Sequence, residues 1–348
     1  MPQGARVTTI DCLRGAAAMA VVWFHVTNGT PNAYSPDWLR ASGRQGFLGV
    51  EVFFVISGFV IPLALQRARY RIRDYGWFVL RRLVRLDPPY FASIALAIAL
   101  TYAFAALPGF RGKPPSYPLP VLLSHIAYAN KFFGLPSVIP VYWSLSLEFQ
   151  YYLLLGLVFP LIGHPRRAVR IVALAGLAAA ALAVPSLLLV FRWLFMFELG
   201  ILAFYLRERM IGVAEYGIGV ALAAAGSYVT LGPDVAVVGV GATLLIAFVV
   251  LRNRLLLFLG DISYSLYLVH VPIAGRVINA GTRVRLGPAT ALLLAIAAVG
   301  LAVVAAYVFH RLIERPARSW SARIPHRTRD ARLPAATAAA ALASTVRE

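Results

Sequence analysis

Apolar stretches long enough to cross a membrane recur along this chain and restrict the folds that it can adopt. Of its 348 residues, 60% are hydrophobic, and the mean hydropathy is +0.75. A helix needs about 20 apolar residues to cross the hydrocarbon core of a bilayer, so this length accommodates about ten spans joined by short loops. The sequence therefore predicts an all-α integral membrane protein, a bundle of about ten transmembrane helices.

The predicted spans alternate with connections that hold most of the charged residues. They lie near residues 13–28, 46–66, 88–107, 141–163, 168–184, 187–207, 213–231, 234–251, 256–277 and 287–312. The first stretch has no small-residue cleavage site and is not expected to be a cleaved signal. The stretch 121–133 is short and flanked by prolines, which favours a re-entrant or interfacial helix over a further span.

The distribution of lysine and arginine predicts the orientation of the bundle. One predicted side carries 23 of these residues and the other carries 8. Because cytoplasmic loops are enriched in positive charge, both termini are predicted to be cytoplasmic, in a multi-pass protein of the inner, or cytoplasmic, membrane. The net charge of +19 is attributed to these loops and to anionic membrane lipids, not to nucleic acid. Residues 318–348 are basic and then alanine-rich, which predicts a disordered cytoplasmic tail.

Motifs for resident metals and nucleotide cofactors do not occur in the sequence. Cys12 is the only cysteine, which excludes an intrachain disulfide and a cysteine metal cluster. The sequence also has no phosphate-binding glycine loop and no HExxH zinc motif. No metal site and no permanently bound cofactor is therefore predicted.

The first apolar stretch carries two ionisable residues, Arg14 and His25. Eleven residues at about 100° each return to within about 20° of the starting direction, so both side chains project from one helix face, roughly 16 Å apart along its axis. Ionisable groups at membrane depth are costly and often mark function. Each residue alone also fits a structural role, as a snorkelling arginine or a hydrogen-bonded interior histidine, but their common face favours a functional pair.

Arg14, Arg82 and Arg85 form a predicted inner layer. Arg82 and Arg85 lie one turn apart in the segment RRLVRLDPPY, so their side chains can face the same way. Arginines that converge at a membrane–cytoplasm boundary are suited to holding phosphate oxygens. Ordinary anchoring of the chain by positive charge at the inner face is the alternative interpretation.

A predicted outer layer contains acids and histidines, contributed by four different spans: His25, Glu51, Glu148 and His270. A histidine near a carboxylate has the composition needed for general-base activation of a hydroxyl. Glu51 also fits an interface-facing position. His270 shares a helix face with Ser263 and Tyr267, so it also fits a structural hydrogen-bond network. Ser57 and Gly58, in FFVISGF, are interpreted as small residues for close helix packing, because the GxSxG nucleophile context is missing.

Several sequence blocks, in this order, resemble the acyltransferase-3 family of integral membrane acyltransferases. They are TTIDCLRGAAAMAVVWFHV, GVEVFFVISGFVI, RRLVRLDPPY, WSLSLEFQYYLL, FRWLFMFELGILAFYL, LGDISYSLYLVHVPI and YVFHRLIERPARSW. Any single block is a weak signal, whereas the ordered set is specific. Arg14 and His25 match the family's essential pair, and Arg82 and Arg85 match its RxxR motif.

This resemblance implies that residues 1–317 form a ten-span acyltransferase domain. It also implies transfer of an acyl group, commonly acetyl, from cytoplasmic acyl-coenzyme A to a hydroxyl of a surface or exported glycan or of a lipid-linked saccharide. Polysaccharide and lipopolysaccharide of the cell envelope are among the acceptors expected. Some relatives act on macrolide antibiotics instead. A homodimer is also compatible with the sequence.

The two predicted layers fit that activity as a hypothesis. Arg14, Arg82 and Arg85 would bind the phosphates of acetyl-coenzyme A, and His25 would act as a general base or accept the acyl group transiently. The sequence does not separate these two roles. Glu148 would orient or charge-compensate His25, and Glu51 and His270 would contact the acceptor. Trp143, Tyr151 and Tyr152 would stack on a sugar ring, although interfacial aromatic residues are also common without a ligand.

The sequence is also compatible with two other functions. A transporter or flippase without chemistry would also contain intramembrane charges and interrupted helices, but no repeat of two halves is evident. A second possibility keeps the acyl transfer and replaces the glycan acceptor with a small secondary metabolite such as a macrolide.

Overall fold

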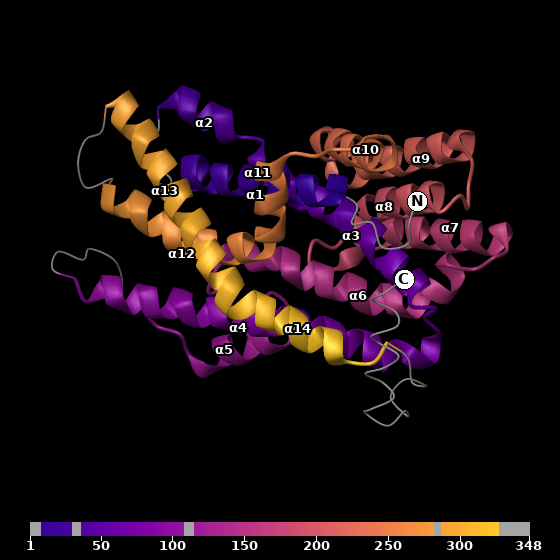
Figure 1. The fold of residues 1–348 in the computed structure, drawn as a ribbon, viewed down its shortest axis with the longest axis horizontal. Coiled ribbons are helices and arrows are strands. Elements are labelled where there is room, and N and C mark those ends of the chain that lie inside the picture. The colour runs from indigo at the N-terminus through magenta and orange to yellow at the C-terminus, as the bar shows by residue number, and fades with distance from the viewer. Residues whose placement is uncertain (1–7, 30–35, 108–114, 282–286, 327–348) are drawn as a thin grey trace.

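The structure, a computed structural model, describes residues 8–29, 36–107, 115–281 and 287–326 (Figure 1). Within these ranges the chain forms helices and no β-strands. A helix satisfies its own backbone hydrogen bonds, which is what a segment surrounded by lipid requires. The predicted all-α fold class is confirmed.

The described residues form fourteen α-helices joined by short connections. The first seven are α1 (Thr8–Asn28), α2 (Asp37–Gly43), α3 (Gly49–Arg67), α4 (Tyr75–Ala105), α5 (Leu119–Ile126), α6 (Trp143–Ile162) and α7 (Arg167–Ala183). The others are α8 (Leu194–Arg207), α9 (Val213–Leu231), α10 (Pro233–Phe248), α11 (Arg254–Asp261), α12 (Ser263–Gly281), α13 (Pro288–Phe309) and α14 (Arg315–Arg323). A π-helical turn, His310–Glu314, joins the last two.

Each of the ten apolar segments predicted from the sequence overlaps at least one of these helices, and the segment 256–277 overlaps both α11 and α12. Five helical segments have the length and apolar character of a membrane crossing: Thr8–Asn28, Asp37–Arg67, Ile72–Ala105, Pro140–Ile162 and Pro288–Arg323. The consecutive helices α11 and α12, bent by 75° relative to each other, would make a sixth crossing. The molecule therefore has the character of a multi-pass membrane protein, and the count of ten crossings stays a prediction.

The third predicted span begins too late in the chain. Its expected range, 88–107, starts at the first of two prolines, but α4 begins at Tyr75 and contains Pro88 and Pro89 in its interior. The added turns hold Arg82 and Arg85, which line an internal cavity. Hydropathy alone did not identify these turns as part of a span, because their polar side chains point into the protein and not into water.

Two shorter helices bear on other predicted boundaries. Helix α5 has 8 residues, too few to cross a bilayer, which fits the predicted re-entrant or interfacial segment. Helix α14 continues past residue 317, where the predicted tail begins. Residues 327–348 of that tail lie outside the described residues.

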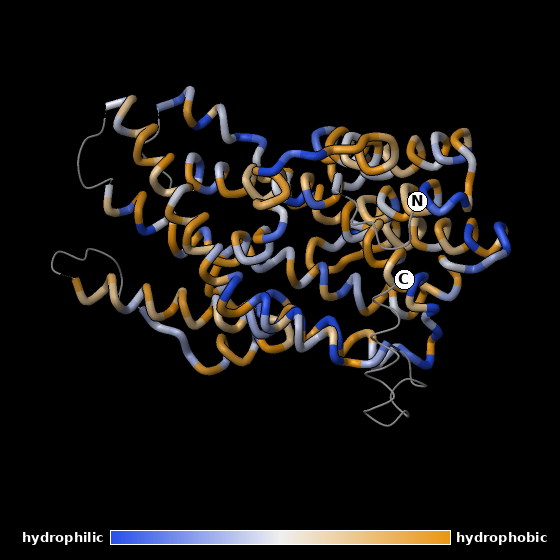
Figure 2. Tube along the Cα trace, in the orientation of Figure 1, coloured by the Kyte–Doolittle hydropathy of each residue, from blue (hydrophilic) through white to orange (hydrophobic). Residues whose placement is uncertain are grey.

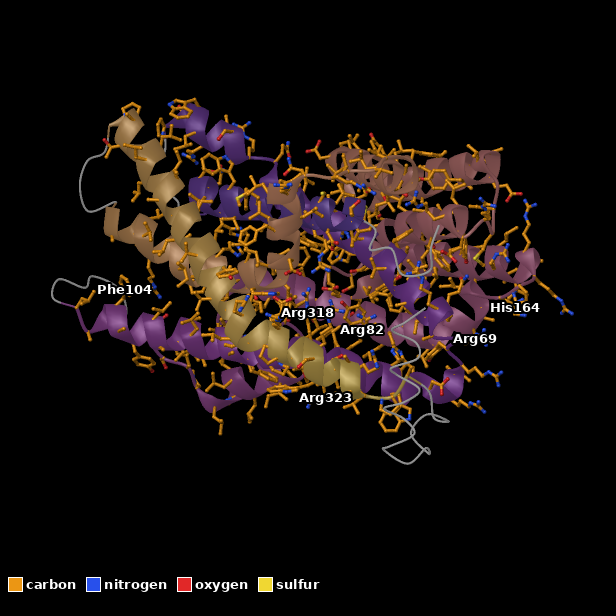
Figure 3. The ribbon with its side chains drawn as sticks, viewed as in Figure 1. Arg69, Arg82, Phe104, His164, Arg318 and Arg323 are labelled. Atoms are coloured by element: carbon orange, nitrogen blue, oxygen red, sulfur yellow. The ribbon has the colours of Figure 1, made fainter. Side chains whose placement is uncertain are left out.

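The helices lie side by side along the long axis of the molecule. Arg69 and His164, in the connections after α3 and α6, lie toward one end, and Phe104, near the end of α4, lies at the other (Figure 3). Helix α1 runs away from the Arg69 end, and α13 and α14 run back toward it (Figure 1). Hydrophilic residues gather in the connection between α3 and α4 (Figure 2). This end corresponds to the predicted inner side of the bundle.

The connection after α3 is fixed to α6 by Tyr70, whose hydroxyl donates to the carbonyl oxygen of Gly156 at 2.7 Å. Burial raises the pKa of Tyr70 to about 12, so the hydroxyl stays protonated and remains a donor at neutral pH.

Small residues let α3 and α8 approach closely at the centre of the bundle. A Cβ atom on Gly58 would overlap the carbonyl oxygen of Phe197, and one on Gly200 would overlap that of Val55. Close approach through small residues is a common way for helices to associate in membranes. The interpretation of Gly58 as a packing residue is confirmed.

Candidate functional site

Helix α1 places Arg14 and His25 against the same neighbour, α12. The Nε atom of Arg14 donates to Ser263 Oγ at 3.1 Å. Two turns further along α12, His270 Nε2 lies 3.3 Å from His25 Nδ1. The common face that the eleven-residue spacing predicts is therefore present, and α1 and α12 run in the same direction along it.

The position of Arg14 depends on close packing between α1 and α11. A Cβ atom on Gly15 would overlap the carbonyl oxygen of Leu256, and one on Gly260 would overlap that of Asp11. The chain then bends by 75° between α11 and α12. This bend brings Ser263, the first residue of α12, to the guanidinium of Arg14.

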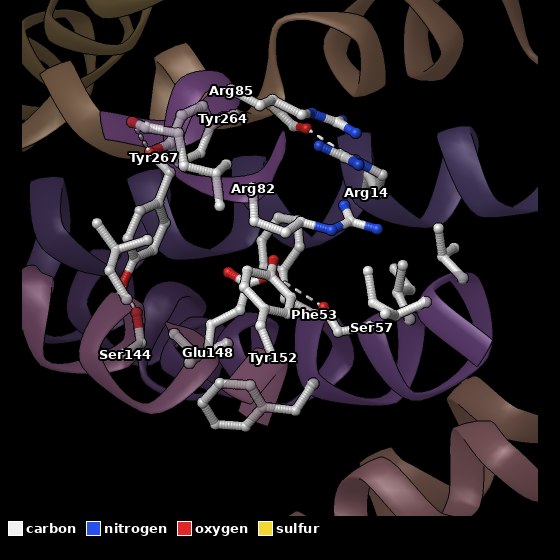
Figure 4. Close-up of a pocket in the computed structure, with 18 of the residues that line it drawn as sticks. Arg14, Phe53, Ser57, Arg82, Arg85, Ser144, Glu148, Tyr152, Tyr264 and Tyr267 are labelled. Carbon is white, nitrogen blue, oxygen red and sulfur yellow. Dashed lines mark hydrogen bonds between the residues drawn. The ribbon is translucent and has the colours of Figure 1, made fainter. Parts of the chain in front are cut away.

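A cavity of about 100 Å³ lies between α1, α3, α4, α6 and α12. Arg14, Arg82 and Arg85 line it, and their guanidinium groups point toward one another (Figure 4). Glu148 and Tyr152 from α6 line the same cavity. Three arginines from two helices far apart in the sequence thus meet at one place, as the predicted inner layer requires.

Two of these arginines have no hydrogen-bond or ion-pair partner among the described residues. Arg82 lies over the rings of Phe78 and Tyr152, with its guanidinium carbon 5.5 Å and 5.3 Å from their centroids. Within the described part of the chain, neither Arg82 nor Arg85 forms a hydrogen bond or ion pair, and Arg85 lies within electrostatic range of Arg14 and Arg82. Guanidinium groups that converge without an ion pair among the described residues are suited to binding an anion, and their planar geometry matches the oxygens of phosphate.

Glu314 also borders the cavity, but its charge is already compensated. Its Oε2 accepts hydrogen bonds from Ser265 Oγ at 2.6 Å and from His310 Nδ1 at 3.0 Å. Its Oε1 lies 3.1 Å from Arg318 Nε. Glu314, His310 and Arg318 belong to the block YVFHRLIERPARSW, and no role was predicted for them from the sequence. The sequence feature that could have identified this cluster is the spacing of His310 and Arg318, four residues before and after Glu314, which places all three on one helix face.

Glu148 does not contact His25, contrary to the expected role in orienting that histidine. Its Oε1 accepts hydrogen bonds from Ser57 Oγ at 2.9 Å and from the hydroxyl of Tyr152. The reason is topological, because α6 packs against α3 and α4, whereas α1 packs against α3 and α12. Glu148 therefore belongs to the arginine cavity, and Ser57, which the sequence analysis assigned to packing alone, also lines that cavity.

The other predicted acceptor residues are dispersed. Glu51 is buried, and its Oε2 has no hydrogen-bond partner among the described residues. Trp143 packs at 5.3 Å from the ring of Trp193, and Tyr151 stacks on Phe197 at 3.8 Å. Neither ring lines the cavity, whereas Tyr152 does.

Tyr267 lies next to both the arginine cavity and His270. It lines the cavity, and its ring lies 5.8 Å from that of His270. Its hydroxyl is bonded to Ser144 Oγ at 2.6 Å and donates to the carbonyl oxygen of Val141 at 2.8 Å, which holds it in place. His25 and His270 do not line the cavity, whereas Glu148, predicted for the outer layer, does. The predicted inner and outer layers are therefore not separate as expected.

Comparison with known proteins relates this arrangement to acyl transfer. The model of the acyltransferase-3 family, described as an acyltransferase domain, matches residues 7–311. A peptidoglycan O-acetyltransferase, OatA, of Listeria monocytogenes is 30% identical over 157 residues, which cover 42% of this chain and 23% of that protein. The O-acetyltransferase OatA of Staphylococcus aureus is 29% identical over 183 residues, 50% of this chain and 28% of its own length. No solved structure matches the chain.

Proposed function

Because the chain belongs to the acyltransferase-3 family, whose model covers residues 7–311, we propose that it is a membrane O-acetyltransferase. The donor would be cytoplasmic acetyl-coenzyme A, and the acceptor would be a hydroxyl of a surface or exported carbohydrate. The chain spans about a quarter of the length of the two OatA proteins, so their activity is a guide to this proposal and not a property transferred whole.

One observation supports the proposed binding site for acetyl-coenzyme A. Arg14, Arg82 and Arg85 line one cavity, and Arg82 and Arg85 have no polar partner among the described residues. Coenzyme A carries three phosphate groups, which guanidinium groups bind through paired, charge-assisted hydrogen bonds. The apolar wall of the cavity, which includes Phe53 and Val60, would contact the less polar arm of the donor.

In the proposed reaction, His25 accepts the proton of the acceptor hydroxyl. The oxygen then attacks the thioester carbonyl, the carbon–sulfur bond breaks, and the coenzyme A thiolate takes up the proton to leave as a thiol. Alternatively, His25 itself attacks the thioester and holds the acetyl group before the acceptor removes it. Both routes require the imidazole to meet the thioester. Because His25 does not line the cavity and Tyr267 borders both the cavity and His270, a movement of the Tyr267 side chain is part of the proposal.

The test uses the purified full-length chain, radiolabelled acetyl-coenzyme A and a carbohydrate acceptor. We expect transfer of label by the wild-type protein and a loss of about 10²-fold or more in the His25→Ala variant, the usual contribution of a general base. Label retained on the wild-type protein, and absent from His25→Ala, would identify the acyl-histidine route. Wild-type transfer by His25→Ala would overturn this mechanism, and transport of an acceptor without thioester cleavage would favour a transporter.

Orientation and location are part of the proposal. The described end that contains Arg69 would face the cytoplasm, with both termini on that side of the inner membrane, because the positively charged loops gather there. Acetyl-coenzyme A would then enter the arginine cavity from the cytoplasm. The acceptor would be a cell-wall polysaccharide, as the name of the Listeria relative, a peptidoglycan O-acetyltransferase, suggests.

A further inference from the structure

The imidazole of His270 is fixed by its own helix. It is fully buried, and its Nδ1 lies 2.8 Å from the carbonyl oxygen of Tyr267 and 3.1 Å from that of Leu266. A carbonyl oxygen only accepts hydrogen bonds, so Nδ1 of His270 must carry a proton. In a neutral imidazole, Nε2 is then an acceptor with a free lone pair.

That lone pair points at the other histidine. His270 Nε2 lies 3.3 Å from His25 Nδ1, and His25 Nδ1 also lies 2.9 Å from the carbonyl oxygen of Val21. Both neighbours of His25 Nδ1 are acceptors, so this nitrogen carries the proton and shares it between them. Nε2 of His25 is consequently the one nitrogen of the two rings that has a lone pair and no hydrogen bond to another described residue.

We propose that His270 is a positioning residue for His25, with its Nε2 serving as an acceptor for the His25 Nδ1 proton during acyl transfer. This inference rests on the proposed function, since it assigns a role in that reaction. It replaces the earlier expectation that a carboxylate orients His25, because Glu148 is bonded to Ser57 and Tyr152 instead. It also replaces the expectation that His270 contacts the acceptor, because its side chain is buried.

His270 would act on the protonated form of His25 that arises during the reaction. When His25 Nε2 takes the hydroxyl proton, the ring becomes an imidazolium, and its positive charge is shared with the Nδ1–H group. That group then has two acceptors, Val21 O and His270 Nε2, which stabilise the cation. The same proton returns from His25 Nε2 to the coenzyme A thiolate, so His270 gains and loses none. The role of His270 parallels that of the carboxylate in a serine-protease triad, but here the acceptor is a neutral imidazole.

The kinetic test compares two substitutions at one position. Gln places an amide oxygen near the site of the imidazole Nε2, whereas Met has a similar reach and no comparable acceptor. We expect His270→Met to lower kcat by about 10- to 100-fold, the usual effect of losing a supporting partner, with the KM for acetyl-coenzyme A unchanged. His270→Gln is expected to keep kcat within about threefold of wild type, because it keeps an acceptor.

A matched control is available at His125. This histidine is also buried, and its Nδ1 bonds to the carbonyl oxygen of Val121 four residues earlier, as in His25, but it contacts neither His25 nor His270. We expect His125→Met to keep the kcat of the folded protein. Wild-type kcat in His270→Met, or equal losses in His270→Met and His270→Gln, would overturn the acceptor role.

A spectroscopic measurement separates this inference from the proposed function. With ¹⁵N-labelled histidine, the wild-type protein should show a protonated Nδ1 and an unprotonated Nε2 for His25, assigned by the loss of these signals in His25→Ala. It should also show coupling across the hydrogen bond between His25 Nδ1 and His270 Nε2, lost in His270→Met. Absence of that coupling in the wild type contradicts the inference even if the enzyme transfers acetyl groups. Inactivity of every variant and of the wild type contradicts the proposed function and leaves this readout intact.

Discussion

Arg82 and Arg85 place two positive charges inside the helix bundle without an ion pair among the described residues. Both residues are half-buried, and the rings of Phe78 and Tyr152 supply cation–π contacts to Arg82, which forms no ion pair among the described residues. The nearby carboxylate of Glu148 accepts hydrogen bonds from the hydroxyl groups of Ser57 and Tyr152. The positive charge therefore remains available to an incoming anion.

Replacement of Arg82 tests this role directly. We expect Arg82→Ala to raise the KM for acetyl-coenzyme A by about tenfold or more, because a hydrogen bond to a charged group contributes about 1.5–3 kcal/mol and each 1.4 kcal/mol is tenfold. The KM for the acceptor should not change. Arg82→Lys should recover part of the loss, since lysine keeps the charge without the paired geometry. Steady-state kinetics with each substrate varied in turn gives both constants, and equal increases in the two KM values would exclude a donor-specific role.

Glu148 is expected to matter for stability as well as for the site. In Glu148→Ala, the hydroxyl groups of Ser57 and Tyr152 lose their common acceptor, which costs about 1–3 kcal/mol when a buried donor is left unsatisfied. Glu148→Gln keeps an acceptor oxygen and should unfold at a temperature closer to that of the wild type. Thermal unfolding of the purified protein in one detergent compares the three. If the two variants are equally stable, these hydrogen bonds do not support the fold.

At the residue scale, the sequence predicted which ionisable groups are buried better than it predicted their partners. The spacing of Arg14 and His25 on one helix correctly predicted their shared face, because helix geometry relates residues of a single segment. The partner of His25 depends on which helices are neighbours. The hydrophobic pattern within one segment does not reveal which helix packs beside it, so it could not show that α1 packs against α12 and not against α6.

At the scale of elements, the contact between α1 and α11 positions the arginine cavity. We expect Gly15→Ala to force these helices apart, because the added Cβ would overlap the backbone of α11, and thereby to weaken donor binding and lower the unfolding temperature. Gly275, within α12, is the matched control, since a Cβ there meets no other atom within 4 Å. Gly275→Ala should leave the protein as stable as the wild type or up to about 1 kcal/mol more stable. Equal unfolding temperatures for both variants would show that the close contact is not required.

Helix boundaries were predictable where a segment is apolar throughout. All ten predicted segments overlap helices, but the sequence did not predict α2, the first turns of α4 or α14, whose residues 318–323 were assigned to a disordered tail. Helix α2 has 7 residues and exposed polar positions, so it has no strong periodicity. The bend between α11 and α12 was also absent from the prediction, because it falls within a single apolar stretch and depends on packing against α1 and α4.

At the scale of the whole molecule, the orientation in the membrane can be measured with introduced cysteines. In a Cys12→Ala background the chain has no other cysteine. Arg40 and Arg69 are both exposed and lie on opposite predicted sides. A maleimide that cannot cross the membrane should label Arg40→Cys in intact cells and Arg69→Cys only after permeabilisation, because positively charged loops stay in the cytoplasm. The reverse pattern would place the arginine cavity open to the outside and exclude a cytoplasmic donor.

The ring of Tyr267 borders the arginine cavity, contacts His270 and is held in place by Ser144 and Val141. This position bears on how a cell tolerates such a protein. A bundle that opened to water from both sides at once would let protons run down their electrochemical gradient, worth about 2.3 kcal/mol per charge at 100 mV. An aromatic side chain held in place beside the cavity would interrupt a continuous file of water at this point. We therefore expect the resting protein to be electrically tight, with no ion conductance in planar bilayers.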